Sequence, residues 1–409
     1  MIDRVRLAPP AARARVDGLP NARGFATSAQ MCDSRTMGVD RGDRSPNFGA
    51  RITQARDDAD MTQAELARAV GLDRTAVAKL EGGTRKVSAT ELVVIAAALD
   101  RPIDWFVTES PPAVVSRRSD AAAGGRSRAL DLKLERLARD SAFLLGQGVL
   151  TDPGRRSALD LPTDLGAAEA LAAQARSLAG VASGPVLDLQ RVVERVGLLA
   201  FCLDLGESGG DAGYVEVGNL GVALINGHVD PGRRRFNLAH ELGHHLFGDA
   251  YAPEVLIGPD SGTERLINAF AVHFLLPRSE AVARWQARGQ DDDRLTALAL
   301  SATFRTSWSV TCNQLRNLGL IDDQTRTRYL TDRPTSADWI ALGERWIAEL
   351  DAPTVPPEYG KRVLHAYLAG KLSGSRTEEL LWGTVVRAEL PDQRPLPLES
   401  LRREFESLR

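Results

Sequence analysis

The stretch RRRFNLAHELGHHLFGD, residues 233–249, constrains the fold of this chain more than any other part of the sequence. It contains His240, Glu241 and His244 in the spacing His-Glu-x-x-His. Residues four apart share one face of a helix, and two imidazoles one turn apart can bind a single zinc ion. The apolar residues of the stretch gather on an adjoining face. The stretch therefore predicts an amphipathic helix that carries a metal site.

Glu241 lies about 100° around this helix from His240, since successive helical residues are separated by that angle. Its carboxylate can then reach a water at the metal rather than the metal itself, which is the position that a general base requires. His245 points further round the helix and is not expected to be a ligand.

A zinc site that hydrolyses its substrate needs a third protein ligand, and the sequence offers Asp249, Glu264, His273 and His228. The segment GTERLINAFAVHFLLP, residues 262–277, predicts a second helix with Glu264 in its first turn. His273 would lie about 180° from Glu264, so both cannot face the first helix. A carboxylate among apolar neighbours needs a compensating interaction. We therefore favour Glu264 as the third ligand and expect His273 to be packed or solvated and Asp249 to cap the helix or face solvent.

Residues 45–108 predict an all-helical domain. In MTQAELARAVGLDRTAVAKLEGG, residues 61–83, Thr62 can cap a short helix and Gly71 supplies a tight turn before a second helix. This is a helix-turn-helix pattern. In its second helix Arg74, Thr75 and Lys79 are expected to point outward toward base edges in the major groove.

Gln63, at the start of the first of these two helices, suits a phosphate contact. The alternative is a helical hairpin whose exposed charges are merely solvated. The first 130 residues hold 20 Arg and Lys against 16 Asp and Glu in a chain of net charge −3, which permits nucleic-acid binding without requiring it.

The rest of the sequence divides around these two patterns. Residues 1–44 predict a disordered tail without a targeting segment, residues 109–165 a linker and a connecting helix, residues 284–335 a helix-turn-helix-like segment, and residues 336–409 a helical region of unknown role. The segments GLLAFCLDL, AGYVEVG and VALINGHV predict three strands. We expect the edge Val222 to Asn226 to accept an extended peptide, with Tyr214 or His228 near its carbonyl oxygen.

Residues 45–108 resemble the phage-repressor-like (XRE-type) helix-turn-helix family, through the patterns TQ-x-x-LA-x-x-x-G and (V/I)-x-x-(L/I)-E-x-G. The resemblance implies binding to double-stranded operator DNA. From the outward-facing Arg74, Thr75 and Lys79 we expect a homodimer that reads a palindromic operator. The resemblance also implies a structural ion pair between Arg56 and Glu81. Asp73 departs from what DNA binding favours, because it brings a negative charge close to phosphate.

RFNLAHELGHHLFGD followed by ERLINAFAVHFLLP is similar to the ImmA/IrrE family of bacterial and phage metallopeptidases, over roughly residues 166–283. The resemblance implies Zn²⁺ bound by His240, His244 and Glu264, with Glu241 as the catalytic base. Leu266 and Ile267 stand where the family usually has an acidic residue and an alanine. The family's substrates imply that a helix-turn-helix repressor is cleaved.

Together these patterns predict an α+β chain that is mostly helical: an all-α helix-turn-helix domain, a zincin-like peptidase domain with a small sheet, and a helical C-terminal region. The predicted function is that of a DNA-binding transcriptional regulator with zinc-dependent endopeptidase activity. The alternative is a transcription factor whose peptidase-like domain only senses a metal or ligand, for which Glu241 would be unnecessary. Three widely spaced cysteines and no long apolar run predict a cytoplasmic protein without a membrane partner.

Overall fold

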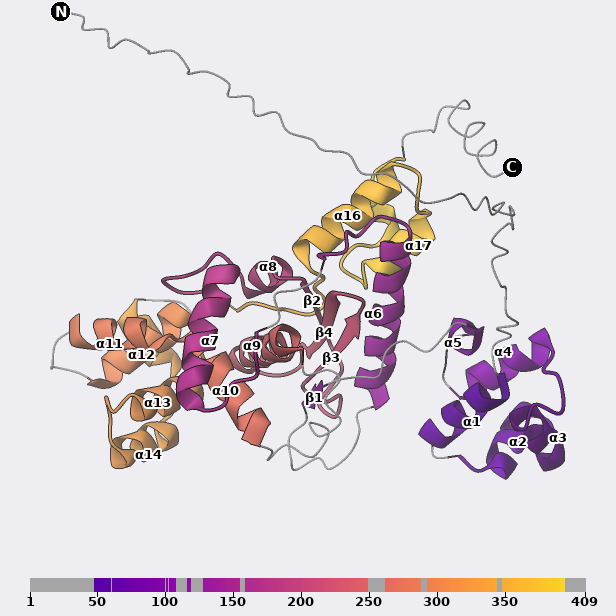
Figure 1. Ribbon diagram of the computed structural model, residues 1–409, viewed down its shortest axis with the longest axis horizontal. Coiled ribbons are helices and arrows are strands. Elements are labelled where there is room, and N and C mark those ends of the chain that lie inside the picture. The colour runs from indigo at the N-terminus through magenta and orange to yellow at the C-terminus, as the bar shows by residue number, and fades with distance from the viewer. Residues whose placement is uncertain are drawn as a thin grey trace, which may run out of the picture. The chain divides into compact units, whose positions relative to one another are not determined.

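The computed structural model describes residues 48–59, 61–99, 101, 103–107, 116–118, 128–154, 159–248, 262–287, 293–343 and 348–393. The tail expected over residues 1–44 lies outside these ranges. Within them, no helix is long and apolar enough to cross a membrane. The predicted architecture is confirmed: helices predominate, a small sheet lies between them, and the N-terminal and C-terminal regions are helical (Figure 1).

The N-terminal domain consists of five helices, namely α1 Phe48–Asp58, α2 Gln63–Val70, α3 Arg74–Glu81, α4 Ala89–Ala98 and α5 Ile103–Val107. Thr62 and Glu65 form a capping box at the start of α2, and Gly71 ends it with φ 70°. Asp73 accepts a hydrogen bond from the Ala76 backbone N–H at the start of α3. The negative charge that looked unfavourable for DNA binding is therefore the cap of this helix.

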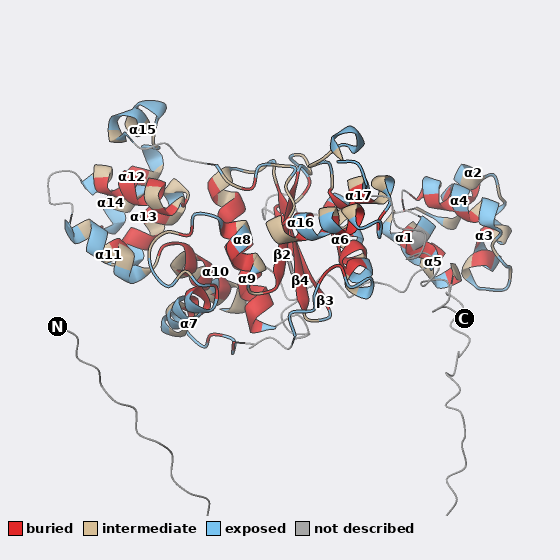
Figure 2. Cartoon of the chain, turned by 90° about the horizontal axis from the view of Figure 1, so that it is seen from above, coloured by how far each residue is buried: buried red, intermediate tan, exposed pale blue. Residues whose placement is uncertain are grey.

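Within the described residues, the sheet contains four strands in the order β1-β3-β4-β2. Their bounds are β1 Ser116–Arg118, β2 Leu198–Leu203, β3 Ala212–Val217 and β4 Leu220–Asn226. β2 pairs in parallel with β4, whereas β3 is antiparallel to both β4 and β1. The three predicted strands are β2, β3 and β4, and every residue in them is buried (Figure 2). Because both faces are buried, helices must cover the sheet on both sides.

One face of the sheet packs against the helices α7 Leu165–Leu178, α8 Leu189–Glu194, α9 Pro231–Phe247 and α10 Gly262–Leu275. α10 lies against both α7 and α9. The predicted helix that carries His240, Glu241 and His244 is α9, and the predicted helix that carries Glu264 is α10. The apolar core between them includes Leu238, Leu242, Phe270 and Phe274.

The other face is covered by α6 Arg128–Gly146 together with α16 Pro357–Leu368 and α17 Gly374–Leu380 (Figure 1). A short 3₁₀ turn, Arg387–Glu389, follows α17. Leu134 and Leu137 of α6 share this core with Phe201 of β2 and Val363 of α16. The C-terminal region had no predicted role. The structure shows that it supplies part of the second layer of the sheet.

A separate cluster of short helices follows α10, with the bounds α11 Arg278–Ala287, α12 Asp293–Phe304, α13 Trp308–Asn317, α14 Asp323–Thr331 and α15 Ser336–Leu342. Phe304, Cys312 and Leu315 lie in its own small core. Only residues 305–307 separate α12 from α13, which gives this region its helix-turn-helix-like sequence.

Two cysteines of the described region are inaccessible. Cys202 and Cys312 are fully buried, and burial raises the pKa of each thiol to about 12. The thiolate, not the thiol, is the nucleophile that attacks thiol reagents. In a Cys32→Ser variant, which leaves only these two thiols, we therefore expect labelling at pH 8 to be more than about 100-fold slower in the folded chain than in denaturant. Rapid labelling of the folded chain, followed by absorbance, would contradict this burial.

Candidate metal centre and DNA-binding helix

α9 is buried on nearly all sides although much of it is polar. Several of its polar side chains hold neighbouring segments. Arg234 donates to Asp351 Oδ1 at 2.8 Å, and Arg235 pairs with Glu349 and donates to Val186 O. His245 lies 3.0 Å from the Tyr214 hydroxyl through Nδ1 and 3.0 Å from Val196 O through Nε2. These buried polar groups of α9 therefore have a structural role.

A second set, His240, Glu241 and His244, meets α10. The Nε2 atoms of His240 and His244 are 3.0 Å apart, and Glu264 places one carboxylate oxygen 3.2 Å from the first and the other 3.5 Å from the second. The three ligand atoms lie within 4.8 Å of one another. Bonds of 2.0–2.1 Å at tetrahedral angles separate the ligands of one zinc ion by roughly 3.3 Å. The cluster has the composition and the spacing of a metal site.

Asn268 orients this site. His240 Nδ1 lies 3.1 Å from Asn268 Oδ1, and an amide oxygen only accepts hydrogen bonds. In the tautomer that makes this hydrogen bond, Nδ1 carries the proton and Nε2 presents its lone pair to Glu264. Such a hydrogen bond fixes the tautomer and the ring plane of a ligating histidine. Sequence reasoning did not assign this role, although Asn268 lies one turn after Glu264 on the same face of α10.

A glycine allows α10 to approach α9 closely. A Cβ on Gly243 would lie 2.8 Å from Ile267 Cγ2 and 3.2 Å from Phe270 Cδ1. A larger residue at this position would displace Ile267 or push the two helices apart. Because Glu264 is on α10 and both histidines are on α9, the absence of a side chain at Gly243 helps to bring the three together.

The other candidate ligands lie elsewhere. His273 is 3.2 Å from Gln314 and 3.8 Å from Glu169, so it is a packed histidine, and burial lowers its pKa. His228 is half exposed and 3.7 Å from Asp204. Asp249 lies outside the described residues.

Two further residues of interest are buried. Glu241, the expected base, directly follows His240 and is fully buried. The hydroxyl of Tyr214 contacts both Glu216 and His245.

The expected peptide-binding edge is wrong. Residues 222–226 belong to β4, which lies between β3 and β2 and has no free edge. The next strand outward is β3, and β1, from the linker, pairs with it in antiparallel register, with Ser116 opposite Tyr214. β1 also lies beside α9. β3 therefore already pairs with an extended segment, β1, on the side of the sheet that lies beside α9, the helix of the metal site.

The second helix of the helix-turn-helix, α3, presents two faces. Arg74, Thr75 and Lys79 are exposed, whereas Val77 and Leu80 are buried in the core of the domain. The exposed face carries two positive charges and a hydroxyl, which can contact base edges and phosphates.

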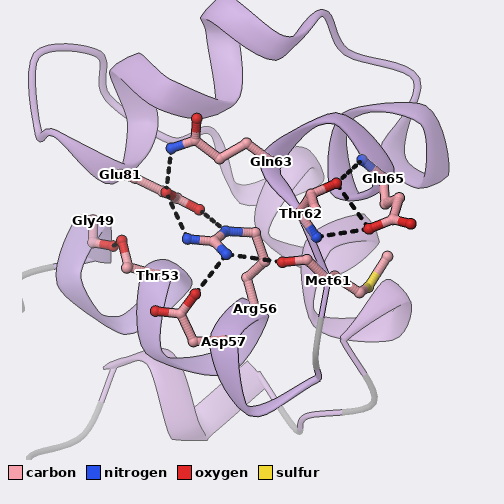
Figure 3. A network of polar contacts seen from close by, with 9 residues as sticks. All are labelled: Gly49, Thr53, Arg56, Asp57, Met61, Thr62, Gln63, Glu65 and Glu81. Carbon is pink, nitrogen blue, oxygen red and sulfur yellow. Dashed lines mark hydrogen bonds and ion pairs between the residues drawn. The ribbon is translucent and has the colours of Figure 1, made fainter.

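A polar network joins three helices of this domain (Figure 3). Arg56 Nε donates to Glu81 Oε1 at 2.7 Å, and Arg56 also donates to Met61 O at 2.8 Å. The hydrogen bond to Glu81 raises the pKa of Arg56 above its usual value. Gln63 Nε2 donates to the other oxygen of Glu81 at 2.8 Å (Figure 3). The Gln63 side chain is thus engaged within the domain in the structure.

Comparison with known protein families agrees with this geometry. The model of the helix-turn-helix family matches residues 52–106, and that of the IrrE N-terminal-like domain, peptidase family M78, matches residues 193–316. The second match includes the metal cluster and extends through α11 and α12 into α13. No curated protein matches the sequence. The chain therefore carries an XRE-type helix-turn-helix DNA-binding domain and an M78 metallopeptidase-like domain of the IrrE type.

Proposed function

We propose that the chain is a transcriptional regulator that binds operator DNA through α3 and cleaves a regulatory protein at the His240, His244 and Glu264 centre. The observation that carries this proposal is the cluster itself: two buried imidazoles and a carboxylate converge beside a fully buried Glu241. Following the resemblance of the sequence, the substrate is a helix-turn-helix repressor or a related regulatory protein.

The residues of the cluster fit a zinc ion. With the His240 Nδ1 proton directed to Asn268, the His240 Nε2 lone pair faces a Glu264 oxygen only 3.2 Å away, and two acceptors at that distance favour a cation between them. Two nitrogen ligands and one oxygen ligand form a set that catalytic zinc uses, with a fourth position for solvent or substrate. When bound, the ion would act as a Lewis acid for peptide hydrolysis.

The protein's own part in hydrolysis falls to Glu241. Its carboxylate accepts a proton from the attacking water, whose oxygen forms the new bond to the peptide carbonyl carbon. The same carboxyl group then gives that proton to the leaving nitrogen as the C–N bond breaks. The products are a carboxylate and an amine, so the reaction consumes only water. A site that merely senses a metal would need the three ligands but no base at Glu241.

The sheet edge supports a polypeptide substrate. β3 pairs with the extended segment Ser116–Arg118 through backbone hydrogen bonds. Such pairing does not depend on side chains, so the same edge suits other extended segments. A substrate strand that takes the place of β1 on β3 would run beside α9, which carries two of the metal ligands.

The direct test is cleavage. The zinc-loaded chain is incubated with helix-turn-helix repressors encoded beside its own gene, and the products are identified by mass spectrometry. We expect one repressor to yield two fragments whose masses sum to that of the repressor plus one water. If every repressor stays intact while the chain still regulates its promoter, the peptidase assignment is wrong and the centre serves sensing.

The DNA-binding face makes a separate prediction. Arg74→Ala removes an exposed guanidinium from the start of α3, so we expect binding to the best operator to weaken by about 1–3 kcal/mol, with relaxed sequence preference. The measurement is a set of binding isotherms and footprints at matched salt. Lys361→Ala, which removes one exposed positive charge outside the domain, is the control and should bind as the parent does. Equal affinity of the Arg74 variant and the parent would show that α3 is not the reading helix.

The homodimer expected on a palindromic operator is part of this proposal. Each domain presents one α3, and two half-sites require two copies whose recognition helices are about one DNA turn apart. Footprints of the parent should therefore cover two half-sites in inverted order.

A further inference from the structure

A large cavity opens at the N-terminal end of α9, outside the metal cluster. Its volume is about 1050 Å³, and its walls come from α9, α10, α13 and the segment from the end of α14 to α15. Three aromatic residues line it, Phe236, Trp308 and Trp339. Polar side chains, among them Asn237 and Arg233, line it as well. A cavity of about this size that combines aromatic walls with polar groups is typical of ligand sites.

The cavity lies one helical turn from the metal centre on each of two helices. On α9, Phe236 and Asn237 line the cavity one turn before His240 and Glu241. On α10, Glu264 and Asn268 belong to the centre and Val272, one turn further, lines the cavity. α10 thus runs antiparallel to α9, and the same two helices border both sites.

Asn237 carries the strongest sign of a missing partner. The residue is 1% exposed, and its Nδ2 atom has no hydrogen-bond partner within the described part of the chain. An unpaired buried donor lowers stability, so such groups are kept where a ligand satisfies them. The main-chain carbonyl of an extended peptide is an acceptor of the required kind.

The walls of the cavity are held in place before any ligand binds. A Cβ on Gly232 of α9 would lie 2.8 Å from Ser307 Cβ and 2.9 Å from its backbone nitrogen, so the first turn of α9 lies directly against the start of α13. On the opposite wall, Arg294 of α12 donates to Asp338 of α15 at 2.9 Å, next to Trp339.

We propose that this cavity is the specificity subsite of the peptidase and accepts a bulky apolar or aromatic side chain of the substrate, while Asn237 Nδ2 donates to the substrate main chain. The proposal rests on the peptidase activity proposed above. A rise of 1.5 Å per helical residue places Asn237 about 4.5 Å and Arg233 about 10 Å along α9 from His240. An extended chain advances about 3.3 Å per residue, so the recognised side chain lies roughly one to three residues from the scissile bond.

The test measures binding with a full-length chain that does not turn over. Zinc-loaded Glu241→Gln protein is titrated with fluorescein-labelled decapeptides of alanine and serine, in which one tryptophan is moved through successive positions. Fluorescence anisotropy then reports binding without cleavage. We expect the decapeptide with tryptophan at one particular position to bind about 10-fold or more tightly than the peptide without it.

Two cavity variants in the same background show where the tryptophan binds. Trp339→Ala should abolish the preference, whereas Ile340→Ala, whose residue is 79% exposed and does not line the cavity, should keep it. Asn237→Leu should weaken the binding of every peptide. The thermal unfolding midpoint of this variant should not fall, because the change removes an unpaired buried donor. A purely structural role of Asn237 would instead lower that midpoint.

The outcomes separate this proposal from the proposed function. If the parent chain binds zinc and cleaves a repressor, but the tryptophan preference survives Trp339→Ala and Asn237→Leu binds every peptide as tightly as the background protein does, the subsite assignment is wrong while the peptidase assignment is unaffected. If the parent neither cleaves nor binds any peptide, both proposals fail together.

Discussion

Glu241→Gln is expected to reduce proteolysis by about two orders of magnitude or more while zinc still binds at one equivalent. The amide keeps the size and the helix propensity of the carboxylate but cannot accept a proton, and a general base contributes a factor of this order. His240, His244 and Glu264 remain in place, so metal content should not change. The measurement is the initial rate of repressor cleavage, together with the metal content of the same sample.

Glu207→Gln is the matched control, since Glu207 is exposed between β2 and β3. This variant should cleave at the parental rate. DNA binding should be parental in both variants, because residues 48–107 have a core of their own. Parental cleavage by the Glu241 variant would remove this residue from the mechanism, and loss of its zinc would mean that the residue supports the metal site instead.

His240→Ala is expected to abolish both metal binding and cleavage. The change deletes one of three protein ligands and leaves the Glu264 carboxylate with a single histidine partner in the centre. Zinc that binds only the folded chain stabilises it, by about 2.7 kcal/mol at one hundred times the dissociation constant. The parent should therefore unfold at a higher temperature with zinc than with a chelator, and the variant should lose this difference.

His228→Ala controls for the loss of a histidine as such, because His228 is half exposed and lies near Asp204 rather than in the cluster. It should keep the zinc-dependent shift in unfolding temperature. A shift retained by His240→Ala, measured by calorimetry with and without chelator, would place the zinc site elsewhere in the chain.

The parts of the molecule that could be predicted from the sequence are those determined by local spacing. The faces of α9, α10 and α3 follow from helical periodicity, so Glu264 is brought to His240 while His273 is directed to Glu169. The capping of α2 by Thr62 is equally local.

The arrangement of the sheet depends on contacts between residues far apart in the chain. The sequence of β4 shows a buried strand but not its neighbours in the sheet. Its parallel pairing with β2 depends on how α8, α9 and the helices of the other face pack. The linker strand β1 has no strand-like sequence pattern of its own and is defined by its pairing with β3.

The role of Asn237 likewise depends on contacts between distant residues, because in the sequence it is only one more polar residue of α9. Its place becomes informative once α13 and α15 are seen to enclose a cavity in front of it. The covering of the sheet by α16 likewise depends on apolar residues that no local motif connects with β2.

X-ray absorption at the zinc edge of the purified parent chain tests the metal centre most directly. The account predicts one zinc per chain with two imidazole nitrogens and carboxylate oxygen at about 2.0–2.2 Å, and one further light ligand from solvent. A first shell that contains sulfur, or a chain that binds no zinc at micromolar concentration, would contradict the account.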